Sequence, residues 1–363
     1  MNVGGDIDKA NVSNIQTDEF KYPVIANALS HDGIYGYTSE YKDDSPCITV
    51  TGRGDVGCAK YRDYPLFPIV RLLVLHSKGK IDCRFGEHAI NSIKKYEEST
   101  GVPQLTAPQL GAYSISFPNL TEQAKIGAFL KLIDERISTQ NRIIDKLKSL
   151  MRGLTDELMD NPKWTKVYVG DFIEFFPTNS LSWEDLNYDN GQVRNLHYGL
   201  IHSGLPTLVD CQKAHLPYIQ VDSLPKQYSI CKDGDVALAD ASEDTAEVGK
   251  TVELTNIETQ TIVCGLHTIH GRDCKDITVN GFKGFAFNSK YFHDQLRRIA
   301  QGSKVYSINT DNVRSCYLYI PTIAEQQKIV GLLRCMQEKI KVAEHGLQLY
   351  EAQKQFLLRG LFV

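Results

Sequence analysis

The clearest pattern in the chain is a run of hydrophobic positions that alternates steps of four and three residues. It extends from Ile126 to Leu158, and nine of its ten positions are apolar, with Gln140 as the exception. The positions are 126, 130, 133, 137, 140, 144, 147, 151, 154 and 158. This spacing places an apolar stripe along one side of an α-helix and is typical of a coiled coil. We therefore predict a long helix over residues 119–161 that packs against another helix.

The same stripe recurs 203 residues later, between Ile329 and Leu361, with Lys354 as its polar position. An Arg-Gly-Leu triplet occurs at 152–154 and at 359–361, an offset of 207, which predicts about one extra turn in the second helix. Helices of about 40 residues extend about 60 Å, and two matched stripes in one chain are expected to pair with each other. The alternative is that each helix lies on its own domain.

Both stripes begin with a shared motif that follows a short apolar stretch. The first copy is Pro-Asn-Leu-Thr-Glu-Gln-Ala-Lys-Ile at 118–126, and the second is Pro-Thr-Ile-Ala-Glu-Gln-Gln-Lys-Ile at 321–329. The proline ends a strand, a threonine (Thr121 or Thr322) caps the helix, and the glutamate lies near the positive end of the helix dipole. This internal repeat predicts the order globule, helix, globule, helix.

The segments before the two helices have β character. Both are rich in Val, Ile, Tyr and Phe and are interrupted by Gly, Pro, Asn and Asp. We predict strands at Tyr22–Ala26, Cys47–Thr51, Val70–His76, Val167–Val169, Val236–Ala239, Thr251–Leu254 and Thr261–Cys264, and a short helix at Phe292–Gln301. The expected segments are 1–118, 119–161, 162–321 and 322–363, with a first globule about 40 residues shorter than the second, which indicates either truncation at its N-terminal end or a recombined allele.

Composition limits the class of protein. Hydrophobic residues make up 42% and charged residues 23% of the chain, which is typical of a folded protein. No apolar run reaches the roughly 20 residues that span a bilayer, and the N-terminus lacks the features of a signal peptide. We therefore expect a cytoplasmic protein with no membrane partner. The net charge of −4 does not indicate a nucleic-acid binder, so any DNA-facing surface has to be a local patch.

Cysteine spacing argues against a metal site. Nine cysteines lie between Cys47 and Cys335 without a Cys-x-x-Cys pair, which favours reduced, buried thiols over a disulfide framework or a zinc site. His267 and His270 are too close in sequence for paired ligands on a helix. We expect no metal site and no cofactor.

The repeated motif, the Arg-Gly-Leu triplets and the order of globules and helices resemble the DNA specificity subunits of type I restriction–modification systems. The resemblance covers nearly the whole chain. Segment 162–321 also looks like a recurrent type of recognition domain, through Trp-Thr-Lys-Val at 164–167, Asn-Leu-His-Tyr-Gly-Leu-Ile-His at 195–202 and Gly-Leu-His-Thr at 265–268. The resemblance implies an α+β fold in which two mixed α/β target-recognition domains are separated by two long helices that pair as an antiparallel coiled coil.

The resemblance also implies function and partners. Each globule would read one half of a bipartite site on double-stranded DNA, and the helices would act as the spacer. The partners would be an adenine methyltransferase subunit in two copies and a restriction and translocase subunit, in a host-defence system. The chain itself would be non-catalytic.

Candidate DNA contacts follow from side-chain chemistry. In the first globule, residues 51–62 follow a predicted strand and gather Arg53, Lys60 and Arg62 in a glycine-rich segment where the backbone can approach DNA closely. The alternative is a tight turn with a solvated charged rim. In the second globule the candidates are Lys250, which also follows a strand, the cluster His197, Tyr198 and His202, and Arg272. A packed, hydrogen-bonded cluster is the alternative for the two histidines and the tyrosine.

We find no catalytic constellation in the sequence. Gly-Lys-Thr at 249–251 lacks the first glycine of a phosphate-binding loop, which is Asp244 here, and Asn-Pro-Lys-Trp at 161–164 departs from the Asn-Pro-Pro-Tyr motif of amino-methyltransferases at Lys163. The alternative to a sequence-reading subunit is a scaffold or decoy of the same architecture, in which the shortened first globule no longer reads DNA. Acidic faces on the globules would favour that alternative.

Overall fold

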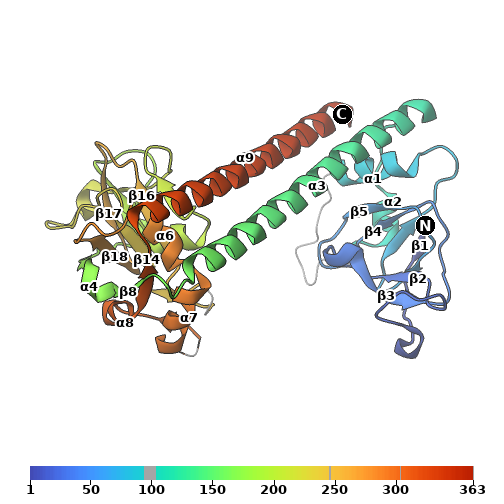
Figure 1. Ribbon diagram of the computed structural model, residues 1–363. Helices are drawn as coiled ribbons and strands as arrows, with labels where there is room; N and C mark the ends of the chain where they lie inside the picture. Colours follow the sequence, from blue (N-terminus) through green and yellow to red (C-terminus); the bar gives the residue numbers. More distant parts are fainter. Residues whose placement is uncertain (94–103, 245–246, 303, 363) are drawn as a thin grey trace. The chain divides into compact units, whose positions relative to one another are not determined.

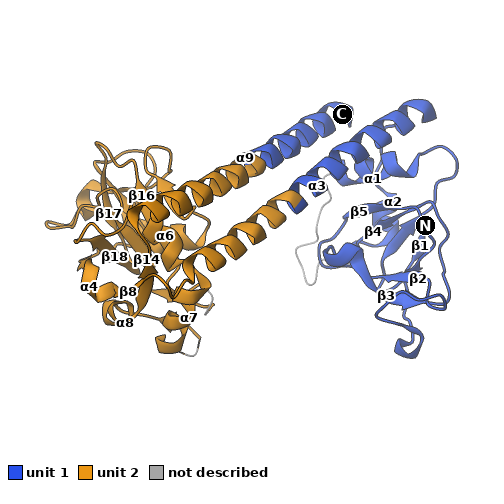
Figure 2. Ribbon diagram, in the orientation of Figure 1, with its two compact units in different colours: residues 1–142, 345–363 blue, residues 143–344 orange. Residues whose placement is uncertain are grey.

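The structure is a computed structural model that describes residues 1–93, 104–244, 247–302 and 304–362. The chain divides into two compact units: unit 1 contains residues 1–142 and 345–363, and unit 2 contains residues 143–344 (Figure 2). The long helices α3 (Leu120–Met159) and α9 (Ile323–Leu361) run through both units. Each unit therefore combines a mixed α/β globule with part of each long helix, and the α+β prediction is confirmed.

The globule of unit 1 contains, within the described residues, a four-stranded sheet of order β1-β7-β4-β5 and a three-stranded sheet of order β3-β2-β6. The strands are β1 (Asn2–Val3), β2 (Tyr22–Ile25), β3 (Ile34–Thr38), β4 (Cys47–Val50), β5 (Ala59–Arg62), β6 (Phe67–Pro68) and β7 (Leu73–Leu75). The helices α1 (Cys83–Ser92) and α2 (Ala107–Gly111) cover the larger sheet (Figure 1), so that Ile90 and Leu110 share a core with Ile48 and Val50 of β4.

The globule of unit 2 is larger. Its described residues form a five-stranded sheet of order β12-β16-β14-β18-β9 and a four-stranded sheet of order β10-β13-β11-β17. The strands are β9 (Ile173–Phe176), β10 (Leu186–Asn187), β11 (Val193–Leu196), β12 (Leu208–Asp210), β13 (Tyr218–Ile219), β14 (Val236–Ala239), β16 (Thr251–Thr255), β17 (Thr261–Cys264) and β18 (Thr268–Asp273). Two short pairs join β8 (Thr165–Tyr168) to β20 (Tyr317–Ile320) and β15 (Ala241–Ser242) to β19 (Tyr306–Ser307).

Short helices complete unit 2. They are α4 (Val169–Phe172), α5 (Tyr198–His202), α6 (Phe282–Phe287), α7 (Lys290–Ile299) and α8 (Thr310–Ser315). The buried phenylalanines of α6 and α7 form the main core of the unit with Ile329, Val330 and Leu333 of α9. Burying large aromatic side chains is a strong source of packing energy, so α9 is an integral part of this globule.

The predicted strands and the short helix at α7 are confirmed, with two partial exceptions. Val169, the end of the predicted strand Val167–Val169, begins helix α4. Val70 and Arg71, at the start of the predicted strand 70–76, have positive φ angles of 53° and 60° and form a turn. The strand β7 therefore begins only at Leu73.

The predicted pairing of the two apolar stripes is also confirmed, and the alternative of separate helices is wrong. In unit 1 the Lys354 ammonium group of α9 pairs with Asp134 of α3, and in unit 2 Lys148 Nζ of α3 lies 2.7 Å from Glu344 of α9. Asp134, nearer the start of α3, pairs with the later α9 residue Lys354, and Lys148, farther along α3, pairs with the earlier α9 residue Glu344. The two helices are therefore antiparallel. All ten stripe positions of α3 and nine of those of α9 are buried or half-buried, and Leu361 is the exposed one.

The Arg-Gly-Leu triplet lies four residues farther from the repeated motif in α9 than in α3, and α9 is continuous helix over this stretch, so the predicted extra turn is present there. In total, α3 has 40 described residues and α9 has 39. Among the described helices, none is long and apolar enough to cross a membrane.

The repeated motif at the helix starts has a structural explanation. Gln123 is fully buried, donates to the carbonyl of Pro118 at 2.8 Å and accepts from the amide of Asp82 at 2.9 Å. Gln326 is equally buried, donates to the carbonyl of Pro321 at 3.0 Å and accepts from the amide of Val279 at 2.8 Å. In both units the glutamine thus joins the first turn of the long helix to a loop of the globule.

The caps of the two helices differ. Thr322 accepts a hydrogen bond from the amide of Glu325, and the Glu325 carboxylate accepts one from the amide of Thr322, as predicted. In α3 the cap is Asn119, whose Oδ1 atom accepts from the amide of Glu122 at 3.1 Å, so the predicted cap Thr121 is wrong.

Candidate nucleic-acid interface

The predicted loop of unit 1 connects β4 to β5 and is tightly hydrogen-bonded. Thr51 Oγ1 accepts from the amide of Cys58 at 2.9 Å, and the amide of Gly57 donates to the Thr51 carbonyl at 2.7 Å. Gly54 and Gly57 have φ angles of 70° and 83°, which favour glycine. The loop therefore presents its side chains from a defined backbone.

Arg53 lies in this loop and is half-buried. No carboxylate of the described residues forms an ion pair with it, and its buried Nε atom has no hydrogen-bond partner. Its backbone forms an isolated bridge with Gln104, and the Gln104 side chain accepts a hydrogen bond from Arg71 at 3.3 Å. Gln104 thus brings Arg71, which is exposed, beside the loop. Arg71 was not predicted from the sequence, because its placement depends on tertiary contacts.

Lys60 and Arg62 lie outside the predicted loop, on one face of β5, because residues 59–62 pair with β4 as a strand. The two side chains share a partner, Asp32. Lys60 is 52% exposed and its ammonium group pairs with the Asp32 carboxylate. Arg62 is 4% exposed and donates to Asp32 Oδ2 at 2.6 Å and to the Tyr64 hydroxyl at 2.8 Å. Burial raises the pKa of the Asp32 carboxyl, but Lys60 and Arg62 outweigh burial and hold this pKa below its usual value. A direct DNA contact by Arg62 would require this ion pair to open.

In unit 2 the predicted cluster at the start of α5 forms a chain of rings. Trp183 packs on His197 with ring centroids 4.4 Å apart, and His197 packs on Tyr198 at 4.7 Å. The Tyr198 ring then meets His202 at 5.9 Å and His267 at 5.2 Å. His197 is 2% exposed and its Nδ1 atom accepts from the Gly199 amide, which caps α5. Burial lowers the pKa of His197, which favours the neutral ring.

The structure brings Lys250 to the same region. Lys250 Nζ lies 2.7 Å from Glu247, and His202 Nδ1 lies 3.8 Å from the same carboxylate. The other nitrogen of His202 is 3.0 Å from the Ala241 carbonyl. Four of the predicted residues, His197, Tyr198, His202 and Lys250, thus lie together. Trp183, which is 46% exposed beside them, was not predicted from the sequence.

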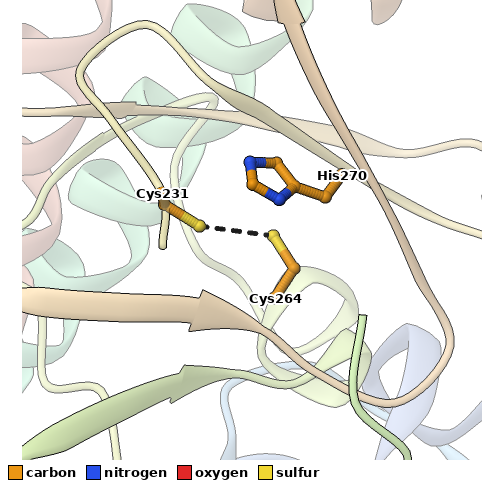
Figure 3. Close-up of side chains that lie close together, drawn as sticks. All are labelled: Cys231, Cys264 and His270. Atoms are coloured by element: carbon orange, nitrogen blue, oxygen red, sulfur yellow. Dashed lines mark hydrogen bonds between the residues drawn. The ribbon is translucent and has the colours of Figure 1, made fainter. Parts of the chain in front are cut away.

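Arg272 lies in a different cluster. Its Nε and Nη2 atoms donate to the two oxygens of Asp235 at 2.7 and 2.6 Å, and its guanidinium covers the Phe176 ring at 4.5 Å. Asp235 Oδ2 also lies 2.7 Å from His270 Nε2, and the His270 ring faces two cysteines (Figure 3). Arg272 therefore has its strongest contacts inside the globule.

Comparison with known proteins shows which proteins this chain is similar to. Residues 4–149 match the type I restriction modification DNA specificity domain. S.MpnORF89P, a type I specificity subunit from Mycoplasma pneumoniae, is 33% identical over 128 residues, which cover 35% of this chain and 38% of that protein. The C-terminal part of S.MpnORF289P, another type I specificity subunit from the same bacterium, is 35% identical over 94 residues, which cover 26% of this chain and 65% of that sequence. The chain thus matches less than two thirds of the length of each relative.

Solved structures share the fold over nearly the whole chain. The S subunit of a type I restriction–modification system from M. genitalium has a TM-score of 0.62 at 15% identity, with 99% of this chain and 92% of that chain covered. A structure described as the basis of complex assembly and conformational transition of the type I R-M system has a TM-score of 0.57 at 15% identity and covers 94% and 90% of the two chains. Residues 4–149 are therefore similar to the type I restriction modification DNA specificity domain, and the chain shares its fold with solved specificity subunits of type I restriction–modification systems.

Proposed function

We propose that this chain is the specificity subunit of a type I restriction–modification complex and reads a bipartite site on double-stranded DNA. The observation that carries the proposal is the duplicated module: a globule is joined to a long helix by the same buried glutamine, Gln123 or Gln326, in each half of the chain. The family match over residues 4–149 supports DNA reading by the first module. Two modules with different side chains would read two different half-sites.

The proposed contacts in unit 1 centre on the loop between β4 and β5. Arg53 has no carboxylate partner among the described residues and would read a guanine edge, for which a guanidinium is well suited. Lys60 and Arg71 are exposed and would hold phosphates. Arg62 would act indirectly, by fixing Asp32 and the face of β5.

In unit 2 the proposed interface is the ring cluster with Lys250. Trp183 and His202 would face bases or sugars, and Lys250 would leave Glu247 for a phosphate. His197 and Tyr198 would position these groups, because His197 is buried and caps α5. Arg272 is the weakest of the proposed contacts, since Asp235 accepts from two of its three donor groups, Nε and Nη2.

The helix pair would recruit the partners. Large apolar side chains point away from the paired stripes and are exposed: Leu132 on α3, and Val342, Leu349 and Phe356 on α9. Exposed apolar patches mark interaction sites. We propose that they bind an adenine methyltransferase subunit, in two copies, within a complex that includes a restriction and translocase subunit. The chain would have no catalytic role of its own and would act in the cytoplasm.

A second function is favoured by one observation. Lys60 and Arg62 share the Asp32 carboxylate, and Lys250 pairs with Glu247, so part of the predicted cationic surface is already paired. A scaffold or decoy of the same architecture, with DNA reading lost in the first globule, would have this property.

The test is selection of binding sites from a random DNA library by the chain purified with its methyltransferase subunit. The proposal predicts an enriched site with two defined halves. Arg53→Ala should relax one position of one half-site, at a cost of about 1–3 kcal/mol for the preferred base, whereas Lys78→Ala, on the exposed part of the same globule, should change nothing. Enrichment of a single half-site would support the decoy, and no enrichment by a stable complex would contradict DNA reading.

A further inference from the structure

A group of potential metal ligands is buried in unit 2, apart from the proposed interface. The Sγ atoms of Cys231 and Cys264 and a ring nitrogen of His270 all lie within 4.8 Å of one another (Figure 3). Each of the three residues is at most 2% exposed. No such site was predicted from the sequence, because these residues are separated by 33 and 6 positions and form none of the usual ligand spacings.

Two of the three ligands lie in β-strands, and the third is hydrogen-bonded to one of these strands. Cys264 ends β17, His270 lies within β18, and the amide of Cys231 donates to the Ile262 carbonyl of β17 at 2.8 Å. β17 belongs to the four-stranded sheet and β18 to the five-stranded sheet. A metal ion at this point would join the two sheets of the globule.

The separation of the sulfur atoms fits a shared metal ion. The two Sγ atoms are 3.6 Å apart, much farther than in a disulfide. Two thiolates bound at about 2.3 Å to a tetrahedral zinc ion lie roughly 3.8 Å apart. Their spacing therefore matches two zinc ligands.

The environment of His270 supplies an independent indication. Its Nε2 atom is hydrogen-bonded to Asp235, and its buried Nδ1 atom has no hydrogen-bond partner besides the cysteines and is directed at the sulfurs (Figure 3). Histidine ligands commonly give their second nitrogen to a carboxylate, which orients the ring and increases its basicity. Asp235 is itself held by Arg272 and by the amide of Lys232 at 2.8 Å.

We propose that Cys231, Cys264 and His270 Nδ1 bind a zinc ion that stabilises unit 2. Charge selects a divalent ion: two thiolates and Asp235 carry three negative charges, and a divalent ion with Arg272 balances them, whereas a monovalent ion leaves the buried site charged. Thiolate and imidazole ligands suit zinc. Among the described residues, no further histidine, cysteine or carboxylate belongs to this group. Water or a main-chain oxygen therefore takes the fourth position on the zinc ion. The zinc site does not depend on the proposed function in DNA reading.

The test measures metal on the purified full chain in the absence of DNA. Zinc content is determined by mass spectrometry, and Co²⁺ is added to the metal-free chain to look for the sulfur-to-cobalt charge-transfer band and the visible bands of a tetrahedral ion. The proposal predicts one zinc per chain and these bands. Cys231→Ser and Cys264→Ser should lose both signals, while Cys211→Ser, which alters another fully buried thiol of the same core, should keep them.

A substitution of Asp235, which is not a proposed ligand, distinguishes an effect on zinc binding from an effect on folding. Asp235→Asn should leave the ligands in place and weaken zinc binding by about 10–100-fold in competition with a chelator, as outer-shell changes do. A folded wild-type chain without metal and without cobalt bands would overturn the site. So would equal zinc binding by Cys231→Ser and Cys211→Ser, or an oxidised chain in which Cys231 and Cys264 form a disulfide and no metal is bound.

Discussion

The three cations of the loop and strand at 51–62 differ in what surrounds them. Arg53 has no ion-pair partner among the described residues, Lys60 forms an exposed pair, and Arg62 is buried against Asp32. An exposed pair contributes little to stability, whereas removing one partner of a buried pair leaves the other without compensation. One strand face thus carries an exposed cation, for which we propose DNA binding, and a buried cation that contributes to stability.

Substitution separates these two roles. Arg62→Met should reduce the free energy of unfolding of the chain by about 1.5–3 kcal/mol, because Asp32, Tyr64 and Thr49 lose a charged donor. Lys60→Ala should stay within about 0.5 kcal/mol of wild type. Urea unfolding followed by circular dichroism measures both. Equal effects would show that Arg62 is not the internal partner of Asp32.

The same aspartate predicts a pH dependence. The pKa of Asp32 lies below its ordinary value of 3.8, so the folded chain favours the ionised carboxylate more than the unfolded chain does. The corresponding stability is present above that ordinary value and is lost as the pH falls through the folded pKa. Thermal unfolding between neutral pH and about pH 3 should therefore show a smaller acid loss for Asp32→Asn than for wild type. An unchanged slope would contradict the ion pair.

At the scale of elements, the apolar stripes and the buried glutamines explain why the repeat is kept in both halves. The stripe pairs α3 with α9, and Gln123 and Gln326 hold each helix start on its globule. Both features are needed because a long helix is stabilised mainly by packing and not by its own propensity.

Two neighbouring leucines on α9 test the stripe. Leu333 is fully buried and Leu332 is 46% exposed. Leu333→Ala should destabilise the chain by about 2–5 kcal/mol through the cavity that it leaves, and Leu332→Ala should cost less than about 0.5 kcal/mol. Denaturant midpoints of the two variants give the comparison. A large effect of Leu332→Ala on folding would mean that the stripe is assigned to the wrong face.

For the whole molecule, local patterns predicted the two long helices and seven of the strands, and missed the other strands of the described residues. The stripes predicted helices over 119–161 and 322–363, and the structure has them at Leu120–Met159 and Ile323–Leu361. The prediction succeeded because the apolar periodicity can be read from neighbouring residues, and the same apolar residues form the surface on which the two helices pair. The turn at Val70 and Arg71 escaped prediction because its positive φ angles are imposed by contacts with Gly4 and Gly5.

The sites were predicted less well because they depend on distant contacts. The loop cations were found from composition, but Asp32, which is 28 and 30 residues from Lys60 and Arg62, changes what they can do. The ligands Cys231, Cys264 and His270 meet only when two sheets assemble. Neither the ion pairs of Asp32 nor the group of Cys231, Cys264 and His270 can be predicted from residue spacing within a single helix or strand.

The most direct test of the central claim is single-molecule methylome sequencing of cells that express this chain with its methyltransferase partner, in parallel with cells that lack the chain. We expect methyladenine at a new bipartite motif that disappears without the chain, and a relaxed base in one half-site with Arg53→Ala. No new motif, although the chain and the methyltransferase form a stable complex, would contradict DNA reading and leave a scaffold that does not recognise a sequence.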